Sequence, residues 1–456
     1  MKSIINIIIL ILLSLSLYII PLNTTAFDFR LGNVLNPEEA EAMKEKYESI
    51  FTVIDDKSFY YNPQTYKIKV DTNLELPETL SEQVSVALSF QDFNKDELIF
   101  EDKDFPDLIV NRTENSFEVH LDLQKIREKL HHSSYSVNVK LNCLGSKFED
   151  EFKVFFEKSD IVLQNNEGGN AQNLIPCFYS DKSLKYSIPI YRDYVQSSNL
   201  FSNVIYSLAK DPQSVEKAGL KPLPLDASFR TNMWFQNGRL RCGLYAESLQ
   251  SIKSREEAEA LVRNLTNSFA ALPSNYIIHE LELYMNDGAK QDIAGYSIAE
   301  AFPIERTTKV YLPFFADSKA KEATYFWVPF NLERGEKIED DVVEILDLYR
   351  RAPEFAKDAK FISLLPDIEA YKNISFVDEK LIIDLSDEMY EFLESNKTYA
   401  SMIREGFALS FSSIHSLKGY ELWHDNELLD EINGVSFGSH IEAPSTYNRL
   451  EEKGEQ

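Results

Sequence analysis

"GYSIAEAFPI", which begins at Gly295, has a counterpart in "GVSFGSHIEA", which begins at Gly434. Each stretch follows a strand-like run and a polar turn, "HELELYMNDG" from His279 in one place and "GYELWHDNEL" from Gly419 in the other. Neither copy contains an obvious catalytic residue. A chain that repeats one order of elements about 139 residues later is built from tandem copies of a domain, so this repeat decides the fold.

Upstream of the repeated stretch, both copies show the same earlier elements. The first has the strand "KYSIPIYRDY" and a helical segment that ends at Pro212, and the second has "TKVYLPFFAD" and a helical segment that ends at Pro353. A proline ends a helix because it has no N–H to donate. Strand–turn–strand patterns follow, "RTNMWFQNGRLRCGLY" with Asn237-Gly238 as its tight turn and "KNISFVDEKLIIDLS" in the second copy.

A second amphipathic helix precedes the closing stretch in each copy. In the first copy Ser254 and Glu257 form a capping-box pattern at its start. Apolar residues at helical spacing line one face of each helix: Leu261, Val262, Leu265, Phe269 and Leu272 in the first, and Met402, Ile403, Phe407, Phe411 and Ile414 in the second. We therefore expect an α+β fold with two β-α-β-β-α-β units, 181–305 and 306–447, whose helices cover one sheet face.

The second copy holds an additional segment of about fifteen residues, "EATYFWVPFNLERGE", which we interpret as an extra strand. Its aromatic run "TYFWVPF" begins at Thr324. In a strand such a run usually belongs to the core. On an edge strand it would instead be a surface for strand addition to a partner, so both interpretations of Trp327 stay open.

The part of the chain before the repeats has a different pattern of hydrophobic and polar residues. Short alternating runs such as "YKIKVDTNLEL", "QVSVALSF" and "YSVNVKLNC" predict antiparallel strands, and we assign residues 65–160 to a small β-sandwich. Residues 27–64 are expected to be a short helical or linker segment, with a helix start at Asn36. The Gly/Asn-rich residues 161–180 are expected to be a linker, and 448–456 a polar tail.

The first 26 residues indicate export. Lys2 precedes an apolar run from Ile4 to Ile20, and a small-residue cleavage pattern ends at Ala26. This segment is either a signal peptide or a membrane tether formed by residues 4–20. Either alternative places the rest of the chain outside the cytoplasm.

Composition excludes several partner classes. The chain has 456 residues, 44% of them hydrophobic, and a formal net charge of −27. Such a charge repels nucleic acid and anionic lipid. The three cysteines, Cys143, Cys177 and Cys242, are too few for a disulfide framework, and we expect small buried side chains. One bridge between two of them stays open.

The element order of residues 180–450 resembles the GerMN domain of sporulation and germination proteins. The similarity rests on the strand Val310–Phe315, the turn Arg351–Pro353, Leu365-Pro366 and "IIDLSDEMYEF". It implies a non-enzymatic module that assembles or stabilises a channel between mother cell and forespore. The chain departs from tandem members of that family because it lacks a lipoprotein cysteine and carries a β-rich domain in front.

Several clusters of polar residues contain side chains that could form a site, but none has the pattern of a known one. His131-His132 are adjacent and cannot share a helix face. His415, His424 and His440 all lie in the second copy, where a metal trio is one interpretation and ordinary surface histidines are the favoured one. The acids of "EDDVVEILD" from Glu339 suit a helix start, and "FQDFNKDELIFEDKD" from Phe90 lacks the glycine of a calcium loop. Ser410, Ser412 and Ser413 are expected on a polar helix face. We therefore assign no catalytic, cofactor-binding or metal residues.

The resulting hypothesis is an exported bacterial protein, secreted or membrane-anchored, of the mother-cell or forespore envelope. It would bind other envelope, channel or germination proteins without catalysis, and oligomerisation is compatible with this role. Two alternatives stay open. One is a cell-wall or carbohydrate-active exported enzyme, and the other is a module that senses a small molecule or glycan.

Overall fold

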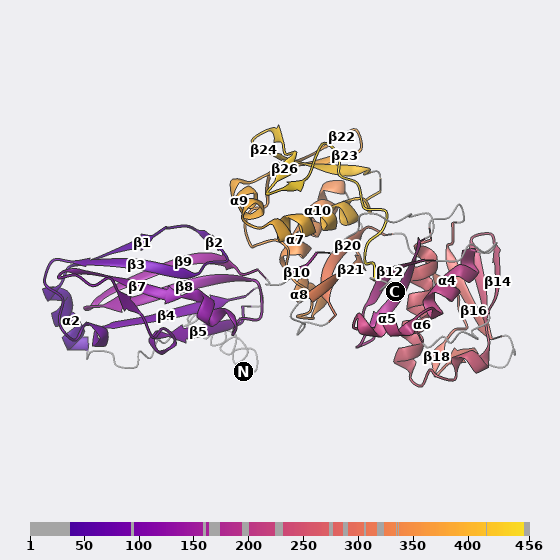
Figure 1. Cartoon of the computed structure of the whole chain (residues 1–456), viewed down its shortest axis with the longest axis horizontal. Coiled ribbons are helices and arrows are strands. Elements are labelled where there is room, and N and C mark those ends of the chain that lie inside the picture. Colours follow the sequence, from indigo (N-terminus) through magenta and orange to yellow (C-terminus); the bar gives the residue numbers. More distant parts are fainter. Residues whose placement is uncertain are drawn as a thin grey trace, which may run out of the picture.

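The computed structural model describes residues 37–450, apart from 93–94, 158–160, 164–173, 194–199, 224–230, 273–276, 286–290, 305–306, 317–322, 334, 336 and 416. Figure 1 shows a β-sandwich, a first module and a second module, with the second module between the other two parts. The predicted signal or anchor segment, residues 1–26, lies outside the described residues. Among the helices that are described, none is long and apolar enough to cross a membrane.

The N-terminal body is a two-sheet β-sandwich, as the alternating runs predict. One sheet has the strand order β1-β3-β7-β6, and the other has β2-β9-β8-β4-β5. The elements are α2 Pro37–Lys46, β1 Ser49–Ile54, β2 Phe59–Tyr61, β3 Thr65–Thr72, η1 Leu80–Glu82, β4 Val84–Gln91, β5 Glu97–Glu101, η2 Asp102–Asp104, β6 Ile109–Val110, β7 Ser116–Asp122, α3 Leu123–Arg127, β8 Ser134–Cys143 and β9 Ser146–Phe155.

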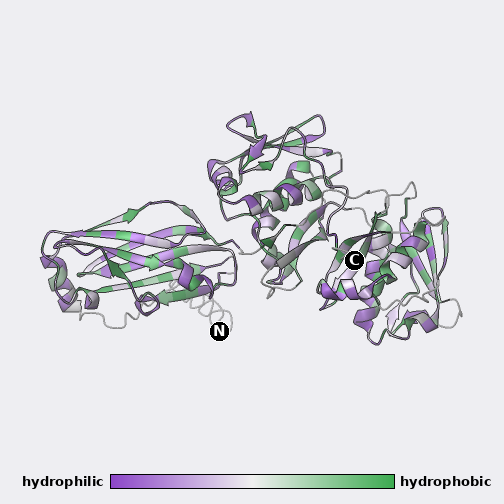
Figure 2. Ribbon diagram, in the orientation of Figure 1, coloured by the Kyte–Doolittle hydropathy of each residue, from purple (hydrophilic) through white to green (hydrophobic). Residues whose placement is uncertain are grey.

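Alternation of polar and apolar residues along each strand places one side chain of every two in the core. In β7 every second residue is buried, and Figure 2 shows the strands striped by hydropathy. The predicted lower boundary of this domain was wrong. Residues 27–64 do contain a helix, α2, but β1 and β2 lie in the same range and pair with β3 and β9. The sandwich therefore begins at Ser49.

The first module contains two sheets with helices between them (Figure 1). The sheets have the orders β12-β11-β13 and β14-β15-β16-β19, and β17 pairs with β18. The elements are β11 Leu174–Asp181, β12 Ser187–Asp193, α4 Leu200–Ala209, α5 Pro212–Lys217, β13 Leu220–Lys221, β14 Thr231–Gln236, β15 Arg239–Leu244, η4 Ala246–Leu249, α6 Arg255–Ala270, β16 Glu280–Met285, β17 Asp292–Ile293, β18 Tyr296–Ser297 and β19 Phe302–Pro303.

The second module repeats this arrangement. Its sheets have the orders β10-β21-β20 and β22-β23-β24-β25, and β26 pairs with β27. The elements are β10 Ile161–Val162, β20 Lys309–Phe315, β21 Ala323–Asn331, α7 Ile338–Arg350, α8 Ala352–Ala356, β22 Tyr371–Val377, β23 Lys380–Leu385, α9 Asp387–Ser395, α10 Lys397–Phe411, β24 Gly419–His424, β25 Glu427–Leu428, β26 Glu431–Ile432 and β27 Val435–Ser436.

The predicted fold class, α+β with tandem modules, is correct, but the predicted layer arrangement was wrong. The helices do not cover one face of a single sheet, because each module has a sheet on either side of them and one apolar core joins all three layers. Pro212 and Pro353 lie just beyond α4 and α7, and each also occupies the start of a short second helix, α5 or α8. A proline is tolerated there because the first turn needs no N–H donor.

A shared hydrogen bond shows which strands of the two copies correspond. In the first module the backbone N–H of Phe178 donates to Ser268 Oγ at 2.9 Å. In the second the backbone N–H of Tyr311 donates to Ser410 Oγ at 3.0 Å. The same contact between the first strand and the second long helix recurs, so β11 corresponds to β20.

The correspondence continues in the next strand and corrects the predicted linker. Phe178 lies opposite Pro189 on β12, and Tyr311 lies opposite Pro329 on β21. Strand β21 is therefore no extra strand, because β12 is its counterpart. The first strand of copy one is β11, which was not predicted as a strand because its residues 174–180 fall inside the predicted linker. All eight of its residues are buried, so the Gly/Asn-rich composition nearby concealed a core strand.

The repeated closing stretch is a two-residue hairpin in both copies. Ala294 and Gly295 have φ of 47° and 83° between β17 and β18, and Asn433 and Gly434 have φ of 49° and 73° between β26 and β27. Two successive positive φ values belong to a type I′ turn, which matches the twist of the paired strands. The predicted turn positions at both glycines are confirmed.

The two copies fill one core position in opposite ways. In the first module Ser187 Oγ donates to Asn264 Oδ1 at 2.6 Å, so a polar pair joins β12 to α6. In the second module Trp327 occupies the corresponding place on β21 and is fully buried. The facing helix position is Gly406, where a Cβ would lie 2.7 Å from the indole ring. The core interpretation of Trp327 is confirmed, and the glycine is there to accommodate the ring.

We expect Gly406→Ala to destabilise the second module by about 1–3 kcal/mol through overpacking, although the same change in an open helix stabilises by about 1 kcal/mol. Denaturant unfolding measures this change. In the Trp327→Leu background, Gly406→Ala should cost less than in the native chain, because the smaller side chain frees the space of the indole while the Tyr349 hydroxyl, 2.8 Å from the added Cβ, remains. Equal effects of Gly406→Ala in both backgrounds would contradict the account.

The modules are joined at the outer edges of β12 and β21, which lie side by side in Figure 1. The fully buried Asn448 lies between them. Its Oδ1 accepts from the backbone N–H of Trp327 at 2.8 Å, and its Nδ2 donates to the backbone carbonyls of Trp327 and Pro189, each at 2.8 Å. The predicted polar tail at 448–456 was therefore wrong at Asn448. Residues 451–456 lie outside the described residues.

We expect Asn448→Ala to destabilise the chain by about 3 kcal/mol, because it leaves an N–H and two carbonyls of the strand edges without their partner. Asn373→Ala, at an exposed position of β22, is the matched control and should change stability by less than about 0.5 kcal/mol. The measurement is denaturant unfolding of the full chain. Equal losses in the two variants would show that the amide does not hold the modules together.

Candidate functional site

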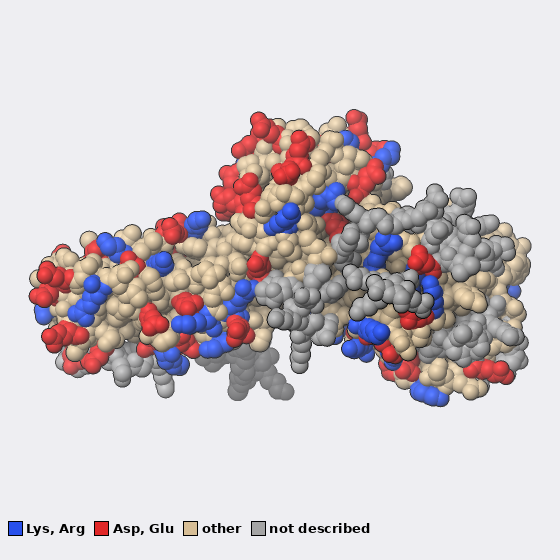
Figure 3. All heavy atoms as spheres, viewed as in Figure 1, with Lys and Arg blue, Asp and Glu red and all other residues tan. Residues whose placement is uncertain are grey.

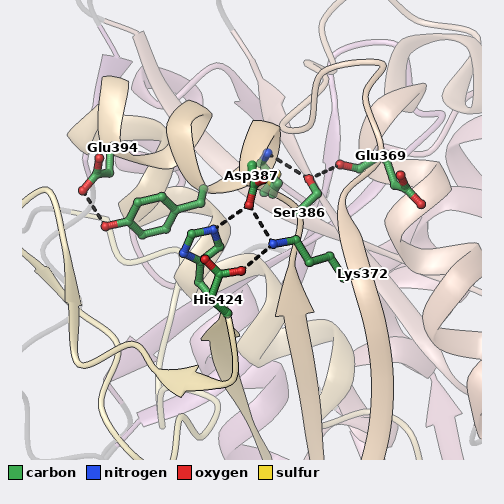
Figure 4. A network of polar contacts seen from close by, with 9 residues as sticks. Glu369, Lys372, Ser386, Asp387, Glu394 and His424 are labelled. Carbon is green, nitrogen blue, oxygen red and sulfur yellow. Dashed lines mark hydrogen bonds and ion pairs between the residues drawn. The ribbon is translucent and has the colours of Figure 1, made fainter.

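Strand β22 lies at the edge of the second module's four-stranded sheet and contributes to a network of charged side chains. Lys372 Nζ lies 2.7 Å from Asp387 Oδ1 and 2.7 Å from Asp425 Oδ1. His424 Nε2 lies 3.0 Å from the same Asp387 oxygen, and its ring stacks on Tyr390 with centroids 4.3 Å apart. Figure 4 shows Lys372 and His424, which come from two different strands, both pointing toward Asp387 at the start of α9.

The electrostatics of this network are those of an ion pair held in water. The hydrogen bond from Lys372, with a second from His424, lowers the pKa of Asp387, and the two carboxylates raise the pKa of Lys372. Asp387, His424 and Asp425 place ligand-type atoms within 4.8 Å of one another. The Lys372 ammonium lies between the two carboxylates, which is the position a cation would take. The donor set therefore fits a lysine better than a metal.

The first module lacks this network. The corresponding positions are Thr231, Ala246 and Met285, none of which is charged. Strand β14, the counterpart of β22, reads "TNMWFQ" and has no charged residue and no proline. Lysine on an edge strand opposes pairing with a foreign strand, whereas an uncharged edge permits it. Within the described residues, β22 is protected by charge and β14 is open.

The outer face of the first module's sheet adds an aromatic group to that open edge. Trp234 is 52% exposed on β14. The Arg241 guanidinium lies 5.6 Å from the Trp234 ring centroid and 5.3 Å from that of Tyr284, and its Nη2 lies 2.8 Å from Glu282 Oε1. The ion pair fixes the guanidinium, and the guanidinium in turn orients the indole. Trp and Arg in such a preorganised setting are typical of protein interfaces.

The sandwich contacts the second module, although the first module follows it in sequence. Phe155 at the end of β9 lies 5.3 Å from Phe392 and 5.5 Å from Tyr399, between ring centroids. Tyr61 also contacts Phe392, at 5.1 Å. In addition, β10 pairs in parallel with β21. An aromatic cluster of this kind gives a joint with a preferred geometry.

A histidine lies between two carboxylates at the same joint. His132 Nε2 is 3.2 Å from Asp92 Oδ2 of the sandwich, and its Nδ1 is 3.3 Å from Glu354 Oε1 of α8. The exposed fractions of the acidic side chains are only 5% and 11%. His131-His132 were not assigned to any site from sequence, and the partners of His132 come from positions distant in the chain. No local spacing signals such a contact.

Burial raises the pKa of the Glu354 carboxyl above its ordinary value of 4.5. The negative charge of Asp92 adds to this rise, and the positive charges of His132 and Arg351 oppose it. Because His132 and Asp92 belong to the sandwich, we expect the pKa of Glu354 to depend on docking, with a less buried carboxyl when the sandwich is released.

The remaining candidates from sequence have structural partners. His424 joins Asp387 and Asp425 rather than His415 or His440, and His440 lies 2.9 Å from Glu442. Ser410 was expected on a polar face, yet it is fully buried and lies 2.8 Å from the Tyr349 hydroxyl. That expectation was wrong because the helix is covered by a sheet on either side.

The acids and the thiols also have structural explanations. Glu339 lies in the first turn of α7, as the helix-start interpretation predicts. Cys143, Cys177 and Cys242 are free and buried, and burial raises the pKa of each thiol to about 12. Thiols of this kind are not ionised at neutral pH and act as small apolar groups.

Comparison with known proteins identifies similar solved structures. The tandem GerMN domains of the sporulation protein GerM from Bacillus subtilis match at 14% identity and a TM-score of 0.42, over 59% of this chain and 99% of that chain. The chain is similar to a tandem GerMN protein. The first GerMN domain of the same protein matches at 15% identity and a TM-score of 0.24, over 30% of this chain and 98% of that chain.

The other comparisons add little. The chitinase ChiW from Paenibacillus matches 49% of this chain and 15% of that chain, at 10% identity and a TM-score of 0.17. No family model and no curated protein matches the chain.

We expect docking of the sandwich to be strongest at acid pH. A carboxyl whose docked pKa is raised favours the docked state fully below its ordinary value, 4.5 for Glu354, and this contribution is lost as pH rises through the docked pKa. Small-angle X-ray scattering across pH 4.5 to neutrality measures the change, as an expansion of the chain when the sandwich releases.

Glu354→Gln should flatten this pH profile, because the amide is neutral throughout. Glu339→Gln, at an exposed position in the first turn of α7, is the matched control and should keep the profile of the native chain. An unchanged profile in Glu354→Gln would remove Glu354 as the titrating group.

Proposed function

We propose that the chain is a non-enzymatic, extracytoplasmic bacterial protein of sporulation or germination. It assembles or stabilises an envelope complex through its two tandem modules, and it is secreted or held at the membrane by its N-terminal segment. The observation that carries the proposal is the outer edge of β14, which is uncharged, pairs with no further strand among the described residues and carries the exposed Trp234. An edge of this kind accepts a strand from a partner through backbone hydrogen bonds, and the neighbouring side chains select the partner.

The asymmetry between the copies supports the proposal. Both modules present an outer strand of similar length, but Lys372 with its two aspartates protects only the second. A protein with two open edges would join strands at both ends and form open-ended assemblies. Of these two corresponding outer strands, only β14 is therefore available for attachment, because the charges on β22 oppose it. The charged residues of the second module and the sandwich, seen in Figure 3, keep those surfaces soluble.

We expect Trp234→Lys to abolish recovery of envelope or channel proteins with the tagged chain from sporulating cells, because a lysine on the edge strand opposes pairing. Stability should change by less than about 1 kcal/mol, since the ring is half exposed. Tyr206→Lys is the matched control, because Tyr206 is 78% exposed but lies on α4. It should recover the same partners as the native chain.

Two outcomes would overturn the proposal. Undiminished recovery with Trp234→Lys would exclude the β14 edge as the attachment point. Hydrolysis of peptidoglycan by the purified chain would contradict the non-enzymatic assignment and favour the alternative of an exported cell-wall enzyme.

A further inference from the structure

A groove separates the sandwich from helix α9 beside the aromatic joint. Its volume is about 430 Å³, and it is lined by residues 54–67 on one side and by α9 on the other. Sites for small ligands fall in the range of roughly 300–1,000 Å³ and are common at domain interfaces. The T-shaped contact of Tyr61 with Phe392 crosses from one wall to the other and sets the width.

The two walls carry opposite charges. Lys57 and Lys67 line the sandwich wall, together with the single acid Asp55. Glu388 and Glu391 line the helix wall, and Figure 3 shows acidic side chains gathered on the flank of the second module where Figure 1 places α9. Within the described residues none of the two lysines and two glutamates belongs to an ion pair, although charged pairs are frequent elsewhere in the chain.

Aromatic side chains form part of the groove, and Tyr60 among them is held in place. The Tyr60 hydroxyl donates to the Asp55 carbonyl at 2.8 Å and accepts from the Lys57 N–H at 3.1 Å, so the turn that carries Lys57 is fixed. Tyr60 also packs edge-on against Phe152, with centroids 5.0 Å apart. A rigid wall does not need to be ordered when a ligand binds, which lowers the entropic cost of binding.

We propose that this groove binds a short peptide with free ends. The ammonium group of the peptide pairs with Glu388 and Glu391, its carboxylate pairs with Lys57 and Lys67, and its side chains lie on the aromatic surface. The complementary charges favour a zwitterion over a neutral saccharide, because a polyol leaves both sets of charges without a counter-ion. The inference is independent of the β14 edge and of the proposed function.

The probe is tetraalanine with free termini, titrated into the purified full chain by isothermal calorimetry. We expect binding with a Kd of about 1 mM or tighter, and a loss of at least about tenfold for the same peptide with acetylated and amidated ends. Glu391→Gln and Lys67→Gln should each weaken binding by about tenfold or more. Glu391→Gln should also reduce the preference for the free over the acetylated amino end, since that side chain is one of the two that pair with the ammonium group.

Matched controls exist on the same two elements. Lys69→Gln changes a lysine two positions further along β3 that pairs with Asp71, and Glu394→Gln changes a glutamate of α9 that accepts from the Tyr390 hydroxyl. Both should bind the probe as the native chain does. Equal binding of the capped peptide, no heat at about 10 mM probe, or binding of chitotetraose in place of the peptide would each overturn the proposal.

Discussion

The relation between the two modules depends on one buried side-chain amide. Strands β12 and β21 turn their outer edges toward each other, and the Asn448 amide provides the acceptor and the two donors that these edges require. A carboxamide has the donor and acceptor pattern of a peptide group, so it can pair with a strand edge as another strand would. The modules are therefore joined by directional hydrogen bonds as well as by apolar contact.

The second module occupies the central position because of its contacts rather than its place in the sequence. Its hairpin β20–β21 pairs with β10, faces β12 and carries the buried Trp327. The aromatic residues Tyr61 and Phe155 of the sandwich pack on its helices. The sandwich and the first module are therefore both positioned by their contacts with the second module.

Much of this fold follows from sequence, and the failures have physical reasons. The tandem repeat, the helix faces and the glycine turns were predicted because periodicity and positive φ leave local signals. Strand β11 was missed because a fully buried strand has no alternation, and its eight residues follow a polar stretch. The extra strand assigned to the second copy was a consequence of that omission.

The candidate sites were less accessible to sequence reasoning. The partners of His132, Lys372 and Asn448 come from distant parts of the chain, and no spacing rule connects them. By contrast, the absence of charge in "TNMWFQ" is visible in the sequence. It acquires meaning only when the sheet order shows β14 at an edge.

The hydrogen bond between Asn448 and Pro189 spans 259 residues of sequence. During synthesis, the outer edge of β12 therefore lacks this hydrogen bond until more than half of the chain has followed. An exposed strand edge in a waiting intermediate is a site for misassembly. Pro189 limits that hazard, because a proline offers no N–H to a wrong partner. Pro189 therefore accepts the hydrogen bond from Asn448 in the finished chain, and before Asn448 has been synthesised it protects the first module by exposing no N–H at this position.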